Sequence, residues 1–313
     1  MAEQDWERGV LEKLAMSAVQ EQRRARHWGI FFKVLTFGYL FVVLFVFMGW
    51  FDKSETALST GKHTALVDMQ GVIAADSAAS ADNMIPGLQE AFKDKGTQGV
   101  ILRINSPGGS PVQAGQINDE IRRLRAKYPA IPLYVVAGDI CASGGYYVAA
   151  AADKIYVDKA TLIGSIGVLM DGFGFTGTME KLGVERRLVT AGANKGFMDP
   201  FSAVRPDQQE YAKQMLAQIH QQFIDVVKQG RGKRLKETSD TFSGLIWNGQ
   251  AAVAMGLADD YGSVESVARD IIKAEEIVDF TVKEGFADRI AKRFGAGVAS
   301  AIGFSTKSGV TLH

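Results

Sequence analysis

Two glycine-rich turns hold the residues whose types and spacing could do chemistry. The first, residues 105–110, reads NSPGGS, and the second, residues 141–147, reads CASGGYY. Each follows an apolar run typical of a buried strand, and loops beyond the carboxyl ends of parallel strands are where ligands bind. In the second turn, Ser143 precedes two glycines and an alanine-rich run with high helix propensity. Its hydroxyl is therefore expected at a helix N-terminus, as the candidate nucleophile of an acyl transfer.

The same two turns supply candidate donors for an oxyanion hole. A helix N-terminus favours negative charge, and a tetrahedral intermediate develops such charge on its oxygen. The Gly144 N–H, together with one from Gly108 or Gly109, is a reasonable pair of donors, because glycine lets the backbone approach a substrate closely. The structural alternative is that Ser143 only caps the helix and that the glycines form a tight turn.

A nucleophilic serine needs a base, and the histidines are poorly placed to provide one. Of the four, His27 adjoins an apolar segment and His313 ends the chain. His63 lies at the edge of a polar linker, and His220 lies within a predicted amphipathic helix. Because neither stands beside a glycine-rich turn, His63 and His220 are kept only as alternative bases.

Lys195 is the better candidate for the base. It lies in the loop 191–200, after the predicted strand 184–190, with apolar Phe197 and Met198 close by in the sequence. A lysine accepts a proton only in its neutral form, and an apolar setting disfavours its charged form. The alternative is an ordinary solvated lysine on a loop.

Composition excludes several other classes of function. The net charge is zero, from 35 basic and 35 acidic residues, which gives no reason to propose a nucleic acid partner. Cys141, the only cysteine, excludes an intrachain disulfide and fits a small buried residue better than a catalytic thiol. No Cys/His cluster has metal-ligand spacing, so we expect neither a metal nor another cofactor.

Residues 28–51 form an apolar segment long enough to cross a membrane. Twenty-four residues of helix span about 36 Å, against a hydrocarbon core of roughly 30 Å. Trp28 and Trp50 lie at its two ends, and Arg23, Arg24 and Arg26 precede it. The positive-inside bias puts residues 1–27 in the cytoplasm and everything after about residue 52 outside it. No small-x-small cleavage site follows, so we expect an uncleaved signal anchor rather than a cleaved signal peptide.

After a polar linker, residues 52–63, the pattern predicts an α/β domain over residues 64–275. Expected strands at 65–69, 99–104 and 131–136 alternate with helices at 83–95 and 113–125, which favours a mostly parallel sheet flanked by helices. Further strands are expected at 154–157 and 184–190, and helices at 206–228 and 249–256. In helix 206–228, Tyr211, Met215, Ile219, Phe223 and Val226 form one apolar stripe. The C-terminal extension, residues 276–313, contains a weakly amphipathic stretch at 287–302, which suits a packed terminal helix or a membrane surface.

Five short segments, in order, resemble the signal peptide peptidase A family of bacterial and archaeal serine proteases. They are INSPGG at 104–109, ASGGYY at 142–147, TLIGSIGV at 161–168, Lys195 with DPF at 199–201, and the glycine-alanine motif at 247–259. The resemblance covers about residues 64–270, and an N-terminal anchor is also typical of the family. It implies a fold like those of ClpP and the crotonases.

The resemblance also implies roles for individual residues. Ser143 would be the nucleophile and Lys195 the general base of a Ser-Lys dyad. Family members cut signal peptides left in the bacterial inner membrane after preprotein processing. They also form homo-oligomers in which neighbouring protomers complete each active site. With one catalytic unit, this chain is similar to the short form of the family.

Three other readings remain open at this point. A related protease could act on other membrane-protein substrates, and the chain could be a non-catalytic membrane scaffold. An acyl-CoA enzyme of the crotonase type would need a carboxylate base and leaves Ser143 without use. The sequence does not give the cleavage preference, the natural substrates, the number of protomers, the role of the C-terminal extension, or whether Ser143 meets Lys195 within a chain or between chains.

Overall fold

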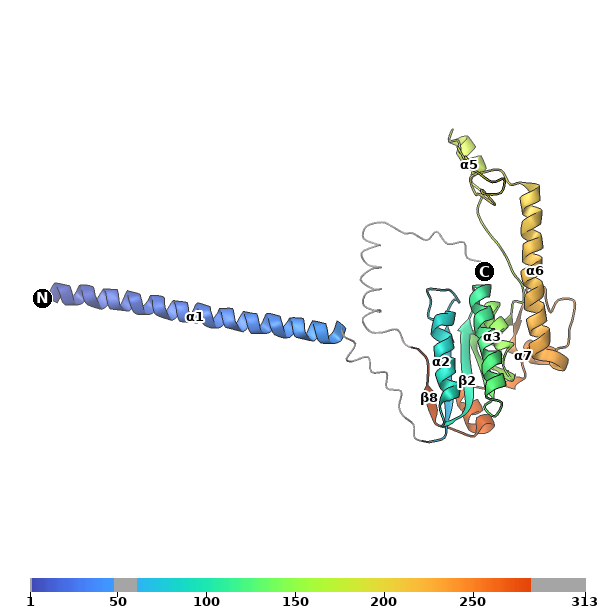
Figure 1. Ribbon diagram of the computed structural model, residues 1–313, viewed down its shortest axis with the longest axis horizontal. Helices are drawn as coiled ribbons and strands as arrows, with labels where there is room; N and C mark the ends of the chain where they lie inside the picture. Colours follow the sequence, from blue (N-terminus) through green and yellow to red (C-terminus); the bar gives the residue numbers. More distant parts are fainter. Residues whose placement is uncertain (1, 48–60, 283–313) are drawn as a thin grey trace. The chain divides into compact units, whose positions relative to one another are not determined.

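The computed structural model describes residues 2–47 and 61–282, which fall into two units. One unit holds helix α1 and the other is globular (Figure 1). The helices are α1 (Ala2–Phe47), α2 (Ala81–Lys93), α3 (Pro111–Lys127), α4 (Gly144–Ala149), α5 (Thr176–Lys181), α6 (Pro206–Arg231), α7 (Gly249–Met255) and α8 (Val264–Ser266), with the 3-10 turn η1 (Gly232–Arg234) and the π-helical turn η2 (Val267–Ile272). The strands are β1 (His63–Gln70), β2 (Thr97–Ser106), β3 (Leu133–Ala142), β4 (Lys154–Val157), β5 (Leu162–Gly164), β6 (Ile246–Asn248), β7 (Asp260–Tyr261) and β8 (Ile277–Asp279).

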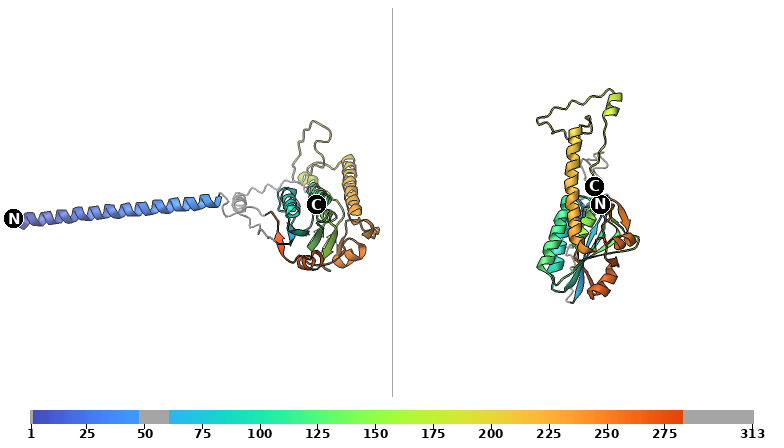
Figure 2. Two further views of the ribbon diagram at one scale, coloured as in Figure 1. Left: turned by 60° about the horizontal axis from the view of Figure 1, so that its bottom comes forward. Right: turned by 90° about the vertical axis from the view of Figure 1, so that its right-hand side faces the viewer.

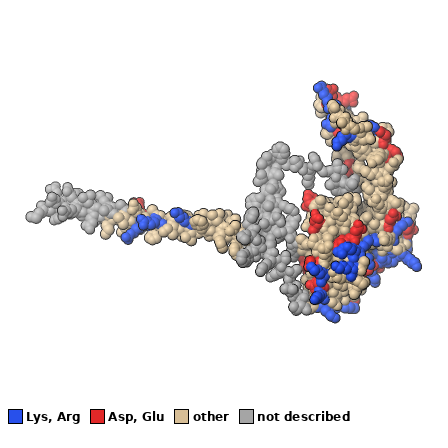
Figure 3. Space-filling model, viewed as in Figure 1, with Lys and Arg blue, Asp and Glu red and all other residues tan. Residues whose placement is uncertain are grey.

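Helix α1 contains the expected apolar segment. The stretch from Val19 to Phe45 is long and apolar enough to cross a membrane, judged by length and composition alone, and none of it is buried inside protein. Figure 3 shows basic side chains in the N-terminal part of this stretch, which contains Arg23, Arg24 and Arg26. The last residues of the predicted span (48–51, with Trp50), most of the linker and the 287–302 stretch lie outside the described residues.

The globular unit is built on one eight-stranded sheet. The strand order is β6-β5-β3-β2-β1-β8, with β4 pairing β3 and β7 pairing β4, and only the β5–β6 pair is antiparallel. Helices α2 and α3 cover one face, while α8 and η2 cover part of the other (Figure 2). The centre of β2, including Val100, Leu102 and Ile104, is fully buried. Near-continuous apolar runs suit strands covered on both faces, and this confirms the predicted α/β class with a mostly parallel sheet.

The predicted strands and helices around the two glycine turns are confirmed, with modest changes at their ends. The strand predicted at 131–136 continues as β3 to Ala142, immediately before Ser143. The helix predicted at 206–228 continues as α6 to Arg231, and Gly256 ends α7 in a left-handed conformation. Strand β8 pairs with β1, so the sheet extends past the expected domain boundary at residue 275.

The strand predicted at 184–190 is wrong. These residues adopt no regular structure and are exposed, within a segment that we call the arm (residues 169–205). The arm carries α5 and stands away from the sheet beside the N-terminal end of α6 (Figure 1). Residues of high β propensity form a strand only where a neighbouring strand accepts their backbone hydrogen bonds, and the structure pairs none with this segment.

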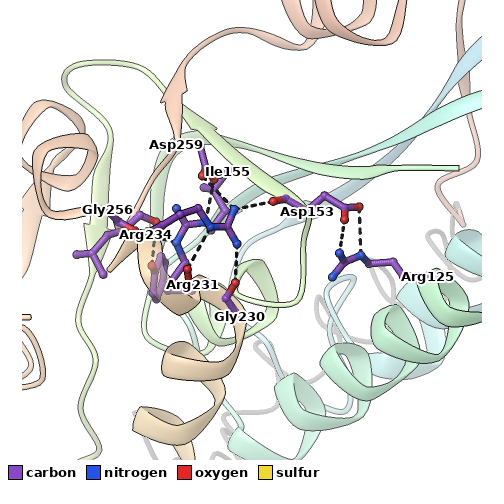
Figure 4. Close-up of polar contacts among 10 residues, drawn as sticks. Arg125, Asp153, Ile155, Gly230, Arg231, Arg234, Gly256 and Asp259 are labelled. Carbon is purple, nitrogen blue, oxygen red and sulfur yellow. Dashed lines mark hydrogen bonds and ion pairs between the residues drawn. The ribbon is translucent and has the colours of Figure 1, made fainter. Parts of the chain in front are cut away.

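A buried ion pair fastens the C-terminal end of α6 to the body (Figure 4). Arg231 is 1% exposed, and it donates from Nε to the Gly256 carbonyl (2.8 Å) and from Nη1 to Asp259 Oδ2 (2.8 Å). Burial alone would raise the pKa of Asp259, but the hydrogen bond and charge of Arg231, with smaller contributions from the Ile155 N–H and Arg234, lower it instead. This ion pair therefore joins α6 to the segment that follows α7.

Replacing Arg231 by alanine is expected to destabilise the globular unit by about 3 kcal/mol, because it removes the buried partner of Asp259 and leaves only the more exposed Arg234 to pair with it. Arg269→Ala is the matched control, since Arg269 pairs with Asp270 in solvent and should cost no more than about 1 kcal/mol. Chemical denaturation of both variants measures the difference. Equal losses of stability in the two variants would contradict a stabilising role of the Arg231–Asp259 ion pair.

Because the folded-state pKa of Asp259 is lowered, the wild type should lose this stabilisation as the pH falls below the ordinary carboxyl range, about 3.9.

Candidate active site

Ser143 lies in the turn between β3 and α4, with a backbone conformation normally reserved for glycine. Its φ is 51° and its ψ is −123°. Its N–H donates to the Gly164 carbonyl of β5 (2.8 Å), and its own carbonyl accepts from the Tyr147 N–H (2.9 Å). Strain of this kind persists only where the surroundings enforce it, and it is frequent at active sites. The side chain makes no capping hydrogen bond, so the structure does not support the alternative that Ser143 is a helix cap.

The two glycine turns come together at Ser143. A β-carbon built on Gly108 would lie 2.6 Å from the Ser143 β-carbon, so only glycine fits there. The Gly108 N–H already donates to Ser106 Oγ (3.1 Å). Among the described residues, the Gly109 and Gly144 N–H groups have no hydrogen-bond acceptor, and a β-carbon built on Gly144 would lie 3.3 Å from the Gly109 nitrogen. Two unpaired N–H groups thus lie close together beside the serine.

An apolar cavity opens at Ser143 and Gly144. Its wall includes Pro111, Ala114, Tyr147, Val168, Ile219 and Phe223. The sequence pattern predicts Ile219 and Phe223 only as members of the packing stripe of a helix. That stripe is buried against the body only in part, since Phe223 is 4% exposed and Tyr211 is 62% exposed. The apolar stripe of α6 is longer than the part of the helix that packs against the sheet. This excess of apolar residues is the sequence signal that could have indicated a site along α6.

Lys195 lies in the arm and is exposed. Arg205 Nη1 donates to the Ala193 carbonyl (2.9 Å), and Gln208 in the first turn of α6 contacts Asn194 and Met198. These contacts hold the loop against the beginning of α6. The cavity at Ser143 is instead bordered by the middle of the same helix.

The length of α6 separates the two predicted catalytic residues within one chain. From Gln208 to Ile219, eleven residues of helix rise about 16 Å, and from Gln208 to Phe223 about 22 Å. An extended lysine side chain reaches roughly 6 Å from its α-carbon. The structure therefore brings Ser143 together with Gly108, Gly109 and Gly144, but it does not bring Lys195 of the same chain to them.

Each alternative base is hydrogen-bonded elsewhere, and the alternative nucleophile is buried. His63 is 1% exposed at the start of β1, where its Nδ1 donates to the Gly61 carbonyl (3.1 Å). His220 donates from Nε2 to the Ile166 carbonyl (3.1 Å). Cys141 is fully buried within β3, and burial raises the pKa of its thiol. In the part of the chain that the structure describes, no cluster of side chains could hold a metal ion.

Comparison with known proteins places these residues in a family. Residues 125–278, which contain both Ser143 and Lys195, match the profile of peptidase family S49. A putative signal peptide peptidase of Enterococcus faecium is 30% identical over 250 residues, which cover 76% of this chain and 72% of that protein.

In two further comparisons, the matched region is a smaller share of this chain or of the compared protein. A Na+/H+ antiporter of Brucella melitensis is 43% identical over 182 residues, and this chain spans 25% of the antiporter's length. A solved structure of a ClpP1 mutant from Listeria monocytogenes covers 63% of this chain and 91% of its own, with 14% identity and a TM-score of 0.40.

Proposed function

The chain belongs to the signal peptide peptidase A family of serine peptidases, peptidase family S49, and we propose that it is a serine endopeptidase with Ser143 as its nucleophile. One observation carries this proposal above all others. A strained serine stands at the start of α4, beside two unpaired N–H groups and at the mouth of an apolar cavity. An acyl transfer needs a nucleophile, an oxyanion hole and a place for the substrate side chain, and this arrangement supplies each of them.

In the proposed mechanism, the Ser143 hydroxyl attacks the scissile carbonyl while neutral Lys195 accepts its proton. The Gly109 and Gly144 N–H groups stabilise the oxyanion that forms. Gly108 is the less suitable donor, because its N–H is already bound to Ser106 Oγ. The protonated lysine then donates to the leaving amine, and water attacks the acyl-enzyme to release the second product.

We propose that Lys195 reaches Ser143 of a neighbouring chain. The rise of α6 supports this arrangement, because the lysine of the same chain is held about 16–22 Å along the helix from the residues that border the cavity. The arm is also rich in exposed apolar side chains, such as Phe173 and Val189, which are 80% and 94% exposed. Apolar surface of this kind favours burial against another molecule. A homo-oligomer would therefore complete each site.

Helix α1 is proposed to anchor the enzyme in the bacterial inner membrane, with its N-terminus in the cytoplasm and its globular unit outside. Its apolar stretch is exposed along its length, with Phe37 71% and Phe41 63% exposed, and the basic cluster at 23–26 lies before the predicted span that begins at Trp28. An apolar peptide that remains after preprotein processing would then lie in the same membrane as the enzyme. We therefore propose cleaved signal peptides as substrates.

Hydrolysis of a synthetic signal peptide by the full-length chain in detergent tests this substrate. The expected result is faster cleavage of the signal peptide than of a peptide of equal length with serines in place of its leucines, because the cavity wall is apolar. Each lost apolar contact should lower kcat/KM by roughly 10-fold or more. Equal cleavage of the two would contradict the preference. Preferential cleavage of membrane-protein loops would favour a related membrane protease, and no cleavage of any peptide would favour a scaffold.

A further inference from the structure

The loop that carries Lys195 has no regular structure, although a base must be held firmly for proton transfer. Productive geometry tolerates displacements of about 0.5 Å, whereas residues 191–200 form a series of mostly exposed turns. We propose that Gln208, assisted by Arg205, is a positioning residue that fixes the Lys195 loop on the start of α6. This inference rests on the proposed role of Lys195 as the base.

Gln208 is buried where its neighbours are not. It is 6% exposed, whereas Asp207 and Gln209 on either side are exposed. A buried amide needs hydrogen-bond partners, and both partners of Gln208 lie in the loop. Its Oε1 accepts from the Met198 N–H (3.3 Å), and its Nε2 donates to Asn194 Oδ1 (3.3 Å). One side chain thus holds the loop both before and after Lys195.

The backbone on either side of Lys195 is constrained in two further ways. Met198 has a φ of 52°, a conformation that residues other than glycine keep only where their surroundings enforce it. Arg205, just before α6, donates from Nη1 to the Ala193 carbonyl (2.9 Å). Ala193, Asn194 and Met198 are therefore all bound to one helix end, and Lys195 lies between them.

These contacts are separate from the packing of the globular unit. Among the described residues, the two buried apolar clusters include none from the arm. Gln208 instead borders a cavity formed by the arm itself, with Phe197 and Met198 in its wall. Loss of the Gln208 amide should therefore loosen the lysine loop while the sheet and the Ser143 turn stay folded.

Gln208→Ala and Gln209→Ala form a matched pair for the test, since they are adjacent glutamines, one buried and one exposed. With detergent-solubilised full-length protein and a cleavable peptide, Gln208→Ala should lower kcat by about 10-fold to 100-fold with little change in KM. Gln209→Ala should match the wild type. Thermal unfolding and native mass spectrometry should give the same melting temperature and assembly for both variants.

Gln208→Glu adds a readout that a merely structural role would not change. A carboxylate at this place keeps the acceptor for Met198 but favours the protonated form of Lys195, so the acidic limb of the pH–rate profile should move to higher pH. Gln209→Glu adds the same charge in solvent, where screening should leave a smaller shift.

Three results would overturn the inference: equal kcat in the two alanine variants, a kcat loss that follows lost stability or assembly, or equal pH profiles in the two glutamate variants. Lys195→Ala in the same assay separates the role of Lys195 as the base from the role of Gln208 in positioning it. If Lys195→Ala stays active, the dyad itself is wrong. If it is inactive while Gln208→Ala is fully active, only the positioning role is wrong.

Discussion

Ser143→Ala is expected to lower peptide hydrolysis by about 10⁴-fold or more, and Lys195→Ala by a similar factor. The two residues act as a unit, because the hydroxyl is a poor nucleophile without a base, and no acyl-enzyme forms without the hydroxyl. Folding should survive both changes. The Ser143 side chain makes no capping hydrogen bond, and Lys195 is exposed.

Lys181→Ala is the control for the lysine variant, because Lys181 is another exposed lysine of the arm and has no role in the mechanism. It should retain wild-type turnover. Circular dichroism and thermal unfolding of all three variants show whether lost activity is a catalytic effect. Near-normal turnover by Lys195→Ala would exclude the dyad and return His220 and His63 as candidate bases. Near-normal turnover by Ser143→Ala would exclude the nucleophile and with it the serine peptidase mechanism.

The sequence predicts the parts of the fold whose signal is local. The central strands are apolar throughout because both faces of a parallel sheet are covered, so β1 and β2 could be located from composition alone. Pro206 near the start of α6 and Gly256 at the end of α7 mark helix ends through their own backbone preferences. Ser143 and its glycines could be found for the same reason.

Features that depend on distant partners could not be predicted. The 184–190 run has strand-like residues, but it lies in the arm, where the structure pairs no strand with it. The choice between Gly108 and Gly109 depends on a bond from Gly108 to Ser106, which spacing does not reveal. The positive φ of Ser143 likewise follows from contacts with β5 and the first glycine turn, not from the serine itself.

The second expected result concerns the separation of Ser143 from Lys195. If each site takes Ser143 from one chain and Lys195 from its neighbour, a mixed oligomer of Ser143→Ala and Lys195→Ala chains should regain activity. Random mixing at equal amounts restores a site only where an intact serine meets an intact lysine, which gives about a quarter of the wild-type sites. If both residues came from one chain, no chain in the mixture would hold an intact pair.

A second mixture tests the same geometry with the reverse expectation, because here pairing within a chain leaves more active sites than pairing between chains. Wild-type chains mixed equally with the double variant Ser143→Ala/Lys195→Ala should keep at most about a quarter of the sites if the pair forms between chains, and about half if it forms within a chain. Co-expression with two different affinity tags and purification through both ensures that the oligomers are mixed.

The most direct measurement is the turnover of the doubly tagged Ser143→Ala and Lys195→Ala oligomer, compared with each variant alone. We predict near-zero turnover for each variant alone. Because purification through both tags removes unmixed oligomers, recovery in the mixed oligomer should be about half of wild-type turnover for a dimer and should fall toward about a quarter as the number of protomers rises. A mixed oligomer that assembles normally and stays inactive would contradict a Ser-Lys dyad formed between chains.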